Sequence, residues 1–164
     1  MHNTRLLAVL AAMLFISMAA YTASLSPSIP ELQLTFSHAG FHQITGQWSD
    51  ADMDIFRRHF LIDFPFLLSY GMLGYRMVNG PGAFRRMATE TRARLALLLP
   101  VAALLDGIEN MFQLYFIATD SPAPEYAHLI AGTAALAKWL LIVAFVVAYI
   151  SGSVRNVRSG GRAV

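Results

Sequence analysis

Four polar side chains recur at helical spacing inside one of the most apolar stretches of the chain. Asp106, Glu109, Asn110 and Gln113 lie at positions i, i+3, i+4 and i+7, which places all four on one face of an α-helix. The opposite face of that stretch carries Leu, Ile, Met and Phe. Carboxyls and amides on one face can hold a proton, bind a cation or hydrogen-bond to a neighbouring helix. The pattern therefore predicts that this face contacts protein and not lipid.

Lys138 is the only lysine of the chain, and it lies within another long apolar run, on a helical stripe with three alanines. Small residues allow two helices to approach closely. Lys138, Asp106 and Glu109 lie at matching depths from the expected outer surface, roughly 14 to 18 Å at 1.5 Å per residue. We therefore predict that Lys138 faces Asp106 or Glu109. An ionised group at the bilayer centre costs about 2.5 to 3.5 kcal/mol, so one of the two carboxyls is expected to hold a proton.

A second group of polar residues surrounds the start of another apolar run. Asp63 follows His59 by one helical turn, and His38 and His42 lie at i and i+4 in the segment before them. A His59–Asp63 pair would suit acid–base chemistry, and these four side chains are possible ligands for Zn²⁺. The glutamate of a His-Glu-x-x-His motif is missing, and Gly40 disfavours a regular helix between the first two histidines. We favour interfacial histidines and a hydrogen-bonded Asp63, and we predict no metal and no cofactor.

Composition indicates a membrane protein. The 164 residues are 56% hydrophobic and 13% charged, whereas soluble domains carry about 25% charged residues. The mean hydropathy is +0.51. The absence of cysteine excludes disulfides, thiol catalysis and thiolate metal ligands. Arginines that flank the apolar runs explain the pI near 9.2, so nucleic acid is not an expected partner and the lipid bilayer is.

Four apolar runs are each long enough to cross a bilayer, which takes about 20 residues. They cover residues 6–25, 59–78, 93–118 and 126–150. The sequence thus predicts an all-α integral membrane protein with a single domain over 1–164, a bundle of four transmembrane helices and a disordered tail at 151–164. An alternative for the first run is a cleaved signal peptide, which would leave three spans.

The distribution of arginine predicts the orientation. Arg5 precedes the first run, five arginines lie between the second and third runs or at their facing ends, three follow the fourth, and the connection 119–125 has none. By the positive-inside rule, both termini are then cytoplasmic.

The first connection, residues 26–58, is then expected outside the membrane. Two capping-box patterns, beginning at Ser28 and Ser49, predict helix starts within it. Phe36, Phe41 and Trp48 suit an amphipathic helical loop at the outer interface.

Two segments, residues 61–70 with Asp63 and residues 104–110 with Asp-Gly-Ile-Glu-Asn, resemble a group of small bacterial four-span membrane proteins. In that group, an aspartate opens the second span and an Asp-x-x-Glu-Asn element lies in the third. The resemblance implies a bacterial cytoplasmic membrane and marks Asp63, Asp106, Glu109 and Asn110 as positions of interest. It implies no activity, and Lys138 is not part of its pattern.

Three functions remain open. The first is non-enzymatic: a structural, accessory or binding subunit with a buried polar core, in a homo-oligomer or a larger membrane complex. The second is a proton- or ion-coupled transport component that uses Asp63, Asp106 and Glu109. The third is a hydrolase-like enzyme at the outer interface, built from the three histidines and Asp63. The chain has no P-loop, dinucleotide-binding fingerprint or Gly-x-Ser-x-Gly motif, which favours the first function.

Overall fold

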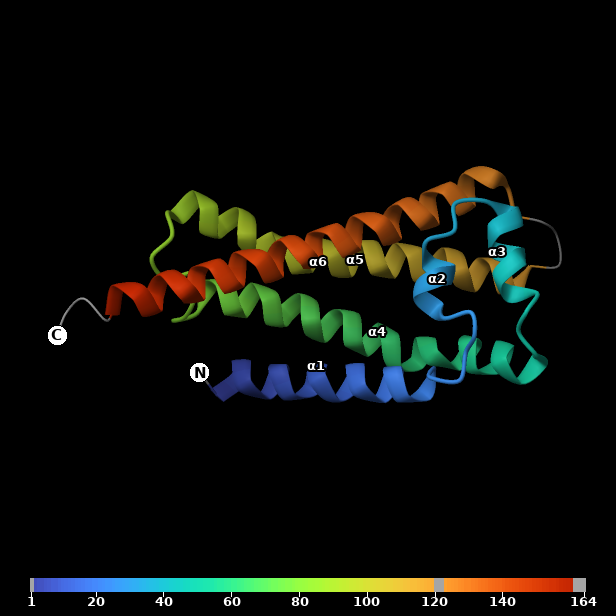
Figure 1. The fold of residues 1–164 in the computed structure, drawn as a ribbon, viewed down its shortest axis with the longest axis horizontal. Coiled ribbons are helices and arrows are strands. Elements are labelled where there is room, and N and C mark those ends of the chain that lie inside the picture. The colour runs from blue at the N-terminus through green and yellow to red at the C-terminus, as the bar shows by residue number, and fades with distance from the viewer. Residues whose placement is uncertain (1, 120–122, 161–164) are drawn as a thin grey trace.

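The computed structural model describes residues 2–119 and 123–160, and their regular secondary structure is entirely α-helical. The helices are α1 (His2–Tyr21), α2 (Ile29–Gln33), α3 (His38–Thr45), α4 (Asp50–Asn79), α5 (Thr89–Ala118) and α6 (Glu125–Gly160) (Figure 1). The predicted all-α class is confirmed for these residues.

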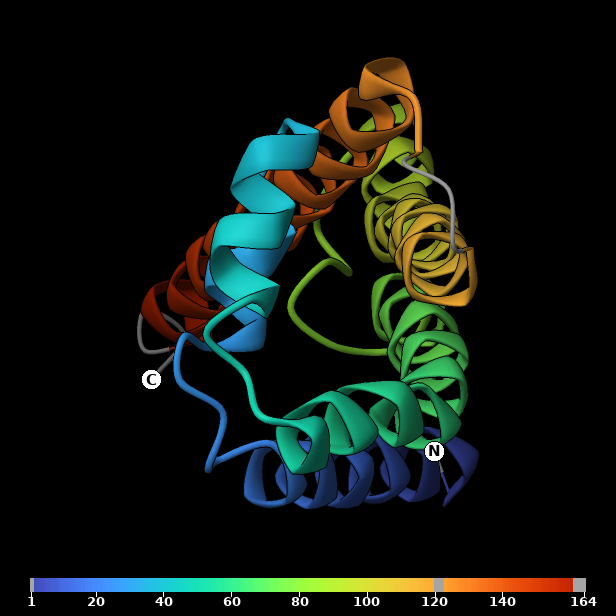
Figure 2. The ribbon, with the colours of Figure 1, turned by 90° about the vertical axis from the view of Figure 1, so that its right-hand side faces the viewer.

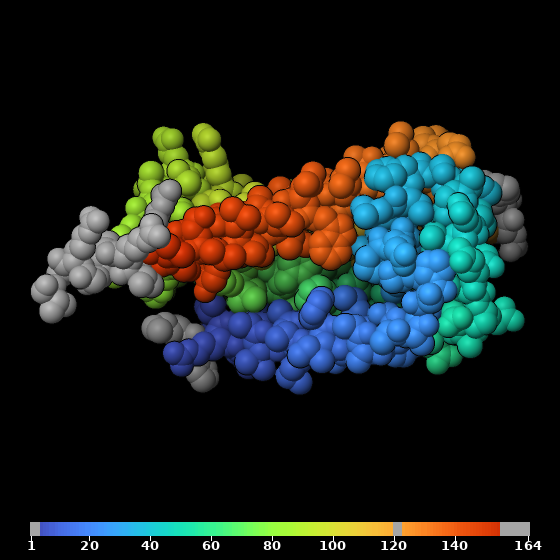
Figure 3. Space-filling view, viewed as in Figure 1, coloured from blue at the N-terminus to red at the C-terminus, as the bar shows by residue number. Residues whose placement is uncertain are grey.

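The four long helices follow one another in the order α1, α4, α5, α6. The extensive interfaces are those of α4 with α5, α5 with α6 and α1 with α4, and within the described residues α6 has no comparable interface with α1 or α4. Seen from the end that carries α3, the long helices therefore form an arch (Figure 2). On one face of the molecule, atoms of α4 are visible between α1 and α6 (Figure 3).

Three helices of the described chain are long and apolar enough to cross a membrane. They provide the segments Thr4–Tyr21 in α1, Thr89–Ala118 in α5 and Glu125–Val154 in α6. The fourth long helix, α4, has the same length as α5, but His59, Asp63 and Ser69 interrupt its apolar sequence and it does not meet this criterion. The three apolar helices agree with the prediction of a membrane protein.

Two capping boxes start the helices of the first connection, as the sequence predicts. The Glu31 carboxylate accepts hydrogen bonds from the backbone N and the Oγ of Ser28, at 2.6 and 2.7 Å. Asp52 does the same for Ser49, at 3.0 and 2.7 Å. These hydrogen bonds lower the pKa of both carboxyls, because they favour the charged form.

We call residues 25–49, which contain α2 and α3, the cap. Its apolar side chains pack on the first turns of α4, where Phe41 and Trp48 contact a cluster that includes Phe56 and Phe60. Phe41 and Trp48 are only 4% and 9% exposed, so both side chains face protein, and the position of the segment at the outer interface stays a prediction. The Trp48 Nε1–H donates to the Pro27 carbonyl oxygen at 2.8 Å. The cap is therefore a small unit packed on α4.

Gly40 lies inside α3, which corrects the expectation that it would interrupt a helix there. It occupies the first turn, where the Ser37 Oγ accepts a hydrogen bond from the Gly40 backbone N at 3.1 Å. This N-cap satisfies an otherwise free backbone donor and offsets the low helix propensity of glycine.

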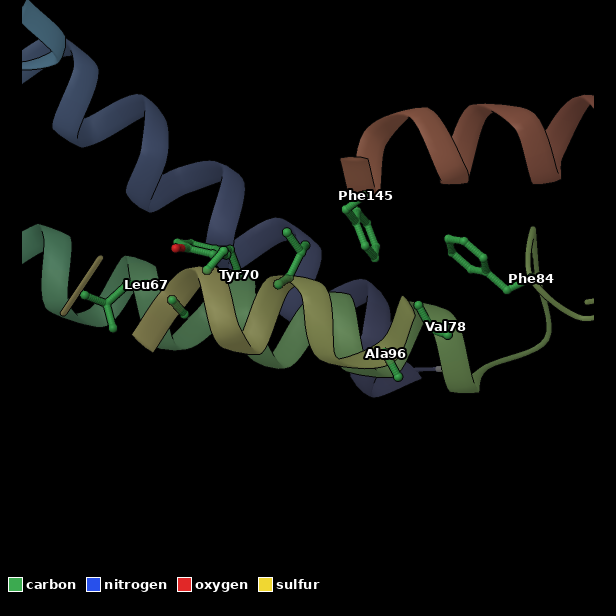
Figure 4. Close-up of a cluster of buried hydrophobic side chains, with 9 residues drawn as sticks. Leu67, Tyr70, Val78, Phe84, Ala96 and Phe145 are labelled. Carbon is green, nitrogen blue, oxygen red and sulfur yellow. The ribbon is translucent and has the colours of Figure 1, made fainter. Parts of the chain in front are cut away.

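The end of the molecule opposite the cap is closed by a second apolar cluster. Phe84, from the connection between α4 and α5, is fully buried and packs near Val78 and Phe145 (Figure 4). In this region α6 continues to Gly160, so the predicted disordered tail is wrong for 151–160, and 161–164 lie outside the described residues. Gly152 accounts for part of the difference, because its missing side chain leaves room for the backbone of Ala83.

Glycine allows the close approach of α4 and α5. A Cβ atom on Gly74 would lie 2.5 Å from the Leu99 Cβ, whereas one on Gly107 would meet nothing within 4 Å. We expect Gly74→Ala to lower the free energy of unfolding in detergent by about 1–3 kcal/mol, because it overpacks this interface. The matched variant Gly107→Ala should leave stability unchanged or raise it by up to about 1 kcal/mol. Equal thermal unfolding midpoints for the two variants would contradict this packing.

Candidate functional site

Lys138 of α6 lies between two carboxyls of α5. Its Nζ is 2.5 Å from the Asp106 Oδ1 and 2.6 Å from the Glu109 Oε2. The ammonium also lies 5.7 Å from the centre of the Trp139 ring. The prediction that Lys138 faces Asp106 or Glu109 is confirmed, and the structure adds that it bridges both. Charge-assisted contacts of this length are among the stronger side-chain interactions in proteins.

Neutral donors connect these carboxyls to their surroundings. The Tyr70 hydroxyl of α4 donates to the Asp106 Oδ2 at 3.1 Å. Within α5, the Gln113 Nε2 donates to the Glu109 Oε1 at 2.7 Å.

A further hydrogen bond joins α4 to α5, because the Asn110 Nδ2 donates to the Asp63 Oδ2 at 2.6 Å. All of these residues are 8% exposed or less, and together they link α4, α5 and α6. We call them the buried network: Asp63, Tyr70, Asp106, Glu109, Asn110, Gln113 and Lys138.

The buried network holds more acid than base. It contains three carboxyls and one ammonium, and none of the described arginines forms an ion pair with those carboxyls. Fully ionised, it would carry two uncompensated negative charges at positions that are 5% exposed or less. Burial of uncompensated charge is expensive in a protein and more so in a membrane. The arrangement can therefore hold protons or another cation in addition to Lys138.

Two acceptors in the network lack a donor among the described residues. They are the Asn110 Oδ1 and the Gln113 Oε1, each on an amide whose NH₂ group donates to a carboxyl. The Asn110 and Gln113 side chains are 0% and 3% exposed. A buried acceptor without a donor costs about 1–3 kcal/mol, so these oxygens favour the presence of a hydrogen-bond donor in the network.

Three histidines gather where the cap meets α6. The rings of His38 and His42 are 4.1 Å apart, and the His38 ring lies 5.5 Å from that of His128. The His128 ring stacks on Phe116 at 3.9 Å, and the Glu125 Oε2 accepts a hydrogen bond from the His38 backbone N at 3.1 Å. Partial burial, together with the neighbouring His38, lowers the pKa of His42. These ring contacts hold α3 against α5 and α6.

His59 stands apart from that cluster. Its Nδ1 contacts the Phe56 carbonyl oxygen, and its ring stacks on Phe56 and packs at a tilt against Phe60. Within the described residues it makes no hydrogen bond to Asp63, whose partner is Asn110. The structure therefore does not bring together His38, His42, His59 and Asp63, the set that the zinc and enzyme alternatives need, because Phe56 and Phe60 hold the His59 ring. No group of three or more His, Asp or Glu side chains in the described part of the chain is placed to hold a metal ion.

An apolar groove of about 950 Å³ lies between α4 and α5 on their outward side. Its lining includes Leu68, Gly71, Leu104 and Gly107, and no carboxyl, amide or ammonium of the buried network contributes to it. Small-molecule sites usually place a few converging polar groups in an apolar pocket. This groove lacks them and has the character of a surface that faces lipid.

The sequence singles out six of the seven network residues as site candidates, with Asp63 in a group apart from the other five, and Tyr70 is not among them. A signal was present, because Tyr70 follows Asp63 by seven residues and therefore lies on the same helical face. His128 is 2% exposed because side chains of the cap and Phe116 cover it.

The chain matches no protein-family model, no curated protein and no solved structure. The resemblance to small bacterial four-span proteins therefore remains a prediction, and the function has to be argued from the buried network.

Proposed function

We propose that the chain is an integral membrane protein in which α1, α4, α5 and α6 each cross the bilayer once. The first turn of α1 and the end of α6 lie at the same end of the molecule, opposite the cap, as four crossings require (Figure 1). The less apolar α4 suits a span because its polar residues are inside. Asp63 and His59 are buried, whereas Leu61 and Leu68 are 77% and 68% exposed.

The proposed orientation places both termini in the cytoplasm and the cap outside. The first turn of α1, which contains Arg5, and the connection between α4 and α5, which contains Arg85 and Arg86, lie at the end of the molecule that holds the termini (Figure 1). The cap contains no arginine or lysine. Cytoplasmic loops of membrane proteins carry an excess of Lys and Arg, so this distribution supports the proposed orientation. The resemblance to small bacterial four-span proteins supports a location in a bacterial cytoplasmic membrane.

Within that membrane, the protein acts as a structural, accessory or binding subunit whose buried network fixes three spans relative to one another. The observation that carries this proposal is the bridge from Lys138 to both Asp106 and Glu109. The alanine-rich face of α6 packs closely on α5, and the one buried ammonium selects a single register for that packing. Buried polar groups have such a role in some proteins. A second copy or a larger membrane complex is the proposed partner.

A neutral network tests this function in cells. The variant Lys138→Met/Asp106→Asn/Glu109→Gln removes the charges and keeps side chains of similar size. We expect it to fold and to complement a strain that lacks the protein, because packing and not charge transfer is required. Complementation by Leu136→Met provides the control. A neutral variant that is inserted and folded but fails to complement would overturn the structural function.

A proton- or ion-coupled transport role is the second candidate, and the excess of carboxyls over lysine favours it. Asp63 is hydrogen-bonded to Asn110, and Glu109 and then Asp106 lie farther from the Ala118 end of α5. Reconstituted protein with a proton-sensitive dye inside the liposomes should then show a flux that Glu109→Gln abolishes. Absence of any pH-dependent signal would remove this candidate.

A further inference from the structure

The three carboxyls of the buried network are not equally compensated. Asp106 is contacted by the Lys138 ammonium and by the Tyr70 hydroxyl. Glu109 is contacted by the same ammonium and by the Gln113 amide. The single side-chain donor to Asp63 among the described residues is the neutral Asn110 amide, at 2.6 Å. A negative charge on Asp63 would therefore have the weakest local compensation of the three.

Burial decides which form of Asp63 is favourable. Its side chain belongs to a residue that is 5% exposed, and the proposed span places it inside the bilayer. One neutral hydrogen bond does not offset the loss of hydration of a carboxylate, and buried acids in such places take up a proton instead. Asp106 and Glu109 can share the positive charge of Lys138, but no cation contacts Asp63 in the described structure.

The unpartnered oxygen of Asn110 is an independent sign that a donor belongs beside Asp63. Its amide already lies against that carboxyl through Nδ2, whereas its Oδ1 accepts no hydrogen bond. A protonated Asp63 gains an O–H group. A half-turn of the amide about its Cβ–Cγ bond then lets the Asn110 Oδ1 accept from that hydroxyl. Protonation thus supplies the donor that the ionised carboxyl lacks.

We propose that Asp63 is a proton-binding site whose carboxyl holds one proton, with Asn110 as its positioning residue. The reaction is the simple addition of a proton to a carboxylate oxygen. The proposal rests on the proposed membrane function, because it needs α4 to lie in the bilayer. The titratable and charged groups that interact electrostatically with Asp63 from its own and the packed helices are Tyr70, Asp106, Glu109 and Lys138, and His59 lies one turn before it on α4.

Infrared spectroscopy of protein in lipid, with isotope-labelled aspartate, tests the proposal. Surface aspartates are ionised near neutral pH, so a protonated side-chain carbonyl band that carries the label must come from a buried aspartate. We expect this band in the unmodified protein and in Asp106→Asn, and its complete loss in Asp63→Asn. In Asn110→Leu the band should remain and move to higher frequency, because the carboxyl loses its hydrogen-bond partner.

Persistence of the band in Asp63→Asn, its loss in Asp106→Asn, or its absence from the unmodified protein would overturn the assignment. The presence or absence of the band in the unmodified protein is a test that needs no variant. The proposal can therefore be overturned even if a substituted protein misfolds. The outcome is also separable from the proposed function. If the folded triple variant fails to complement in cells, the structural role is overturned. The aspartate band reports only whether Asp63 holds a proton.

Discussion

Lys138→Met should lower the free energy of unfolding in detergent by about 3–5 kcal/mol, the usual loss when one partner of a buried ion pair is removed. Lys138 is 3% exposed and its Nζ contacts both Asp106 and Glu109. Methionine fills a similar volume but supplies no charge, so both carboxyls lose their cation and their shortest contact. Both must then bind protons or draw water into the bundle.

The matched control is Leu136→Met, two residues earlier on α6 and 43% exposed. It introduces the same side chain on a surface that faces away from the buried network, and we expect it to change stability by less than about 0.5 kcal/mol. Equal unfolding midpoints for the two methionine variants would mean that the ion pairs contribute nothing to the fold.

Phe56→Ala should have an effect of similar size at the cap. Phe56 is fully buried, and its ring packs 5.0 Å from Trp48 and 5.3 Å from Phe60. Removal of a buried phenylalanine ring leaves a cavity and costs about 3–5 kcal/mol. The loss should appear as faster hydrogen exchange in α2 and α3 and as a shift of Trp48 fluorescence, because these elements pack on α4 through that ring.

Phe36→Ala is the control, since Phe36 belongs to the cap but is 40% exposed. It should leave exchange in α2 and α3 close to that of the unmodified protein. If Phe56→Ala also leaves hydrogen exchange in α2 and α3 unchanged, the cap is not packed on α4. The burial of His128 and Phe41 beneath the cap would then be contradicted.

Much of the buried network is predictable from sequence because membrane burial makes polar residues conspicuous. The spacing of Asp106, Glu109, Asn110 and Gln113 indicates one helical face, and the energetic cost of their charges indicates that this face is covered. Depth counted along two helices was then enough to pair Lys138 with α5. These inferences depend on local periodicity, which a single sequence contains.

The packing of the cap is not predictable from local sequence patterns. Whether Phe41 and Trp48 face lipid or protein depends on where α4 passes, and that contact joins residues distant in sequence. The burial of His59 is not predictable for the same reason, since aromatic neighbours and a backbone carbonyl decide its orientation. The end of α6 was missed because the close contact of Gly152 with the connection before α5 is invisible in a Gly- and Ser-rich segment.

Thermal unfolding of the single, double and triple network variants tests the central claim most directly, that the buried charges fix the packing of α5 and α6. We predict that Lys138→Met is strongly destabilised, that Asp106→Asn or Glu109→Gln restores part of the loss, and that the triple variant returns to within about 1 kcal/mol of the unmodified protein. The opposite result is a gain in stability from Asp106→Asn or Glu109→Gln alone, with no rescue of Lys138→Met. It would show that the fold does not use these charges and that they serve a bound proton or ion instead.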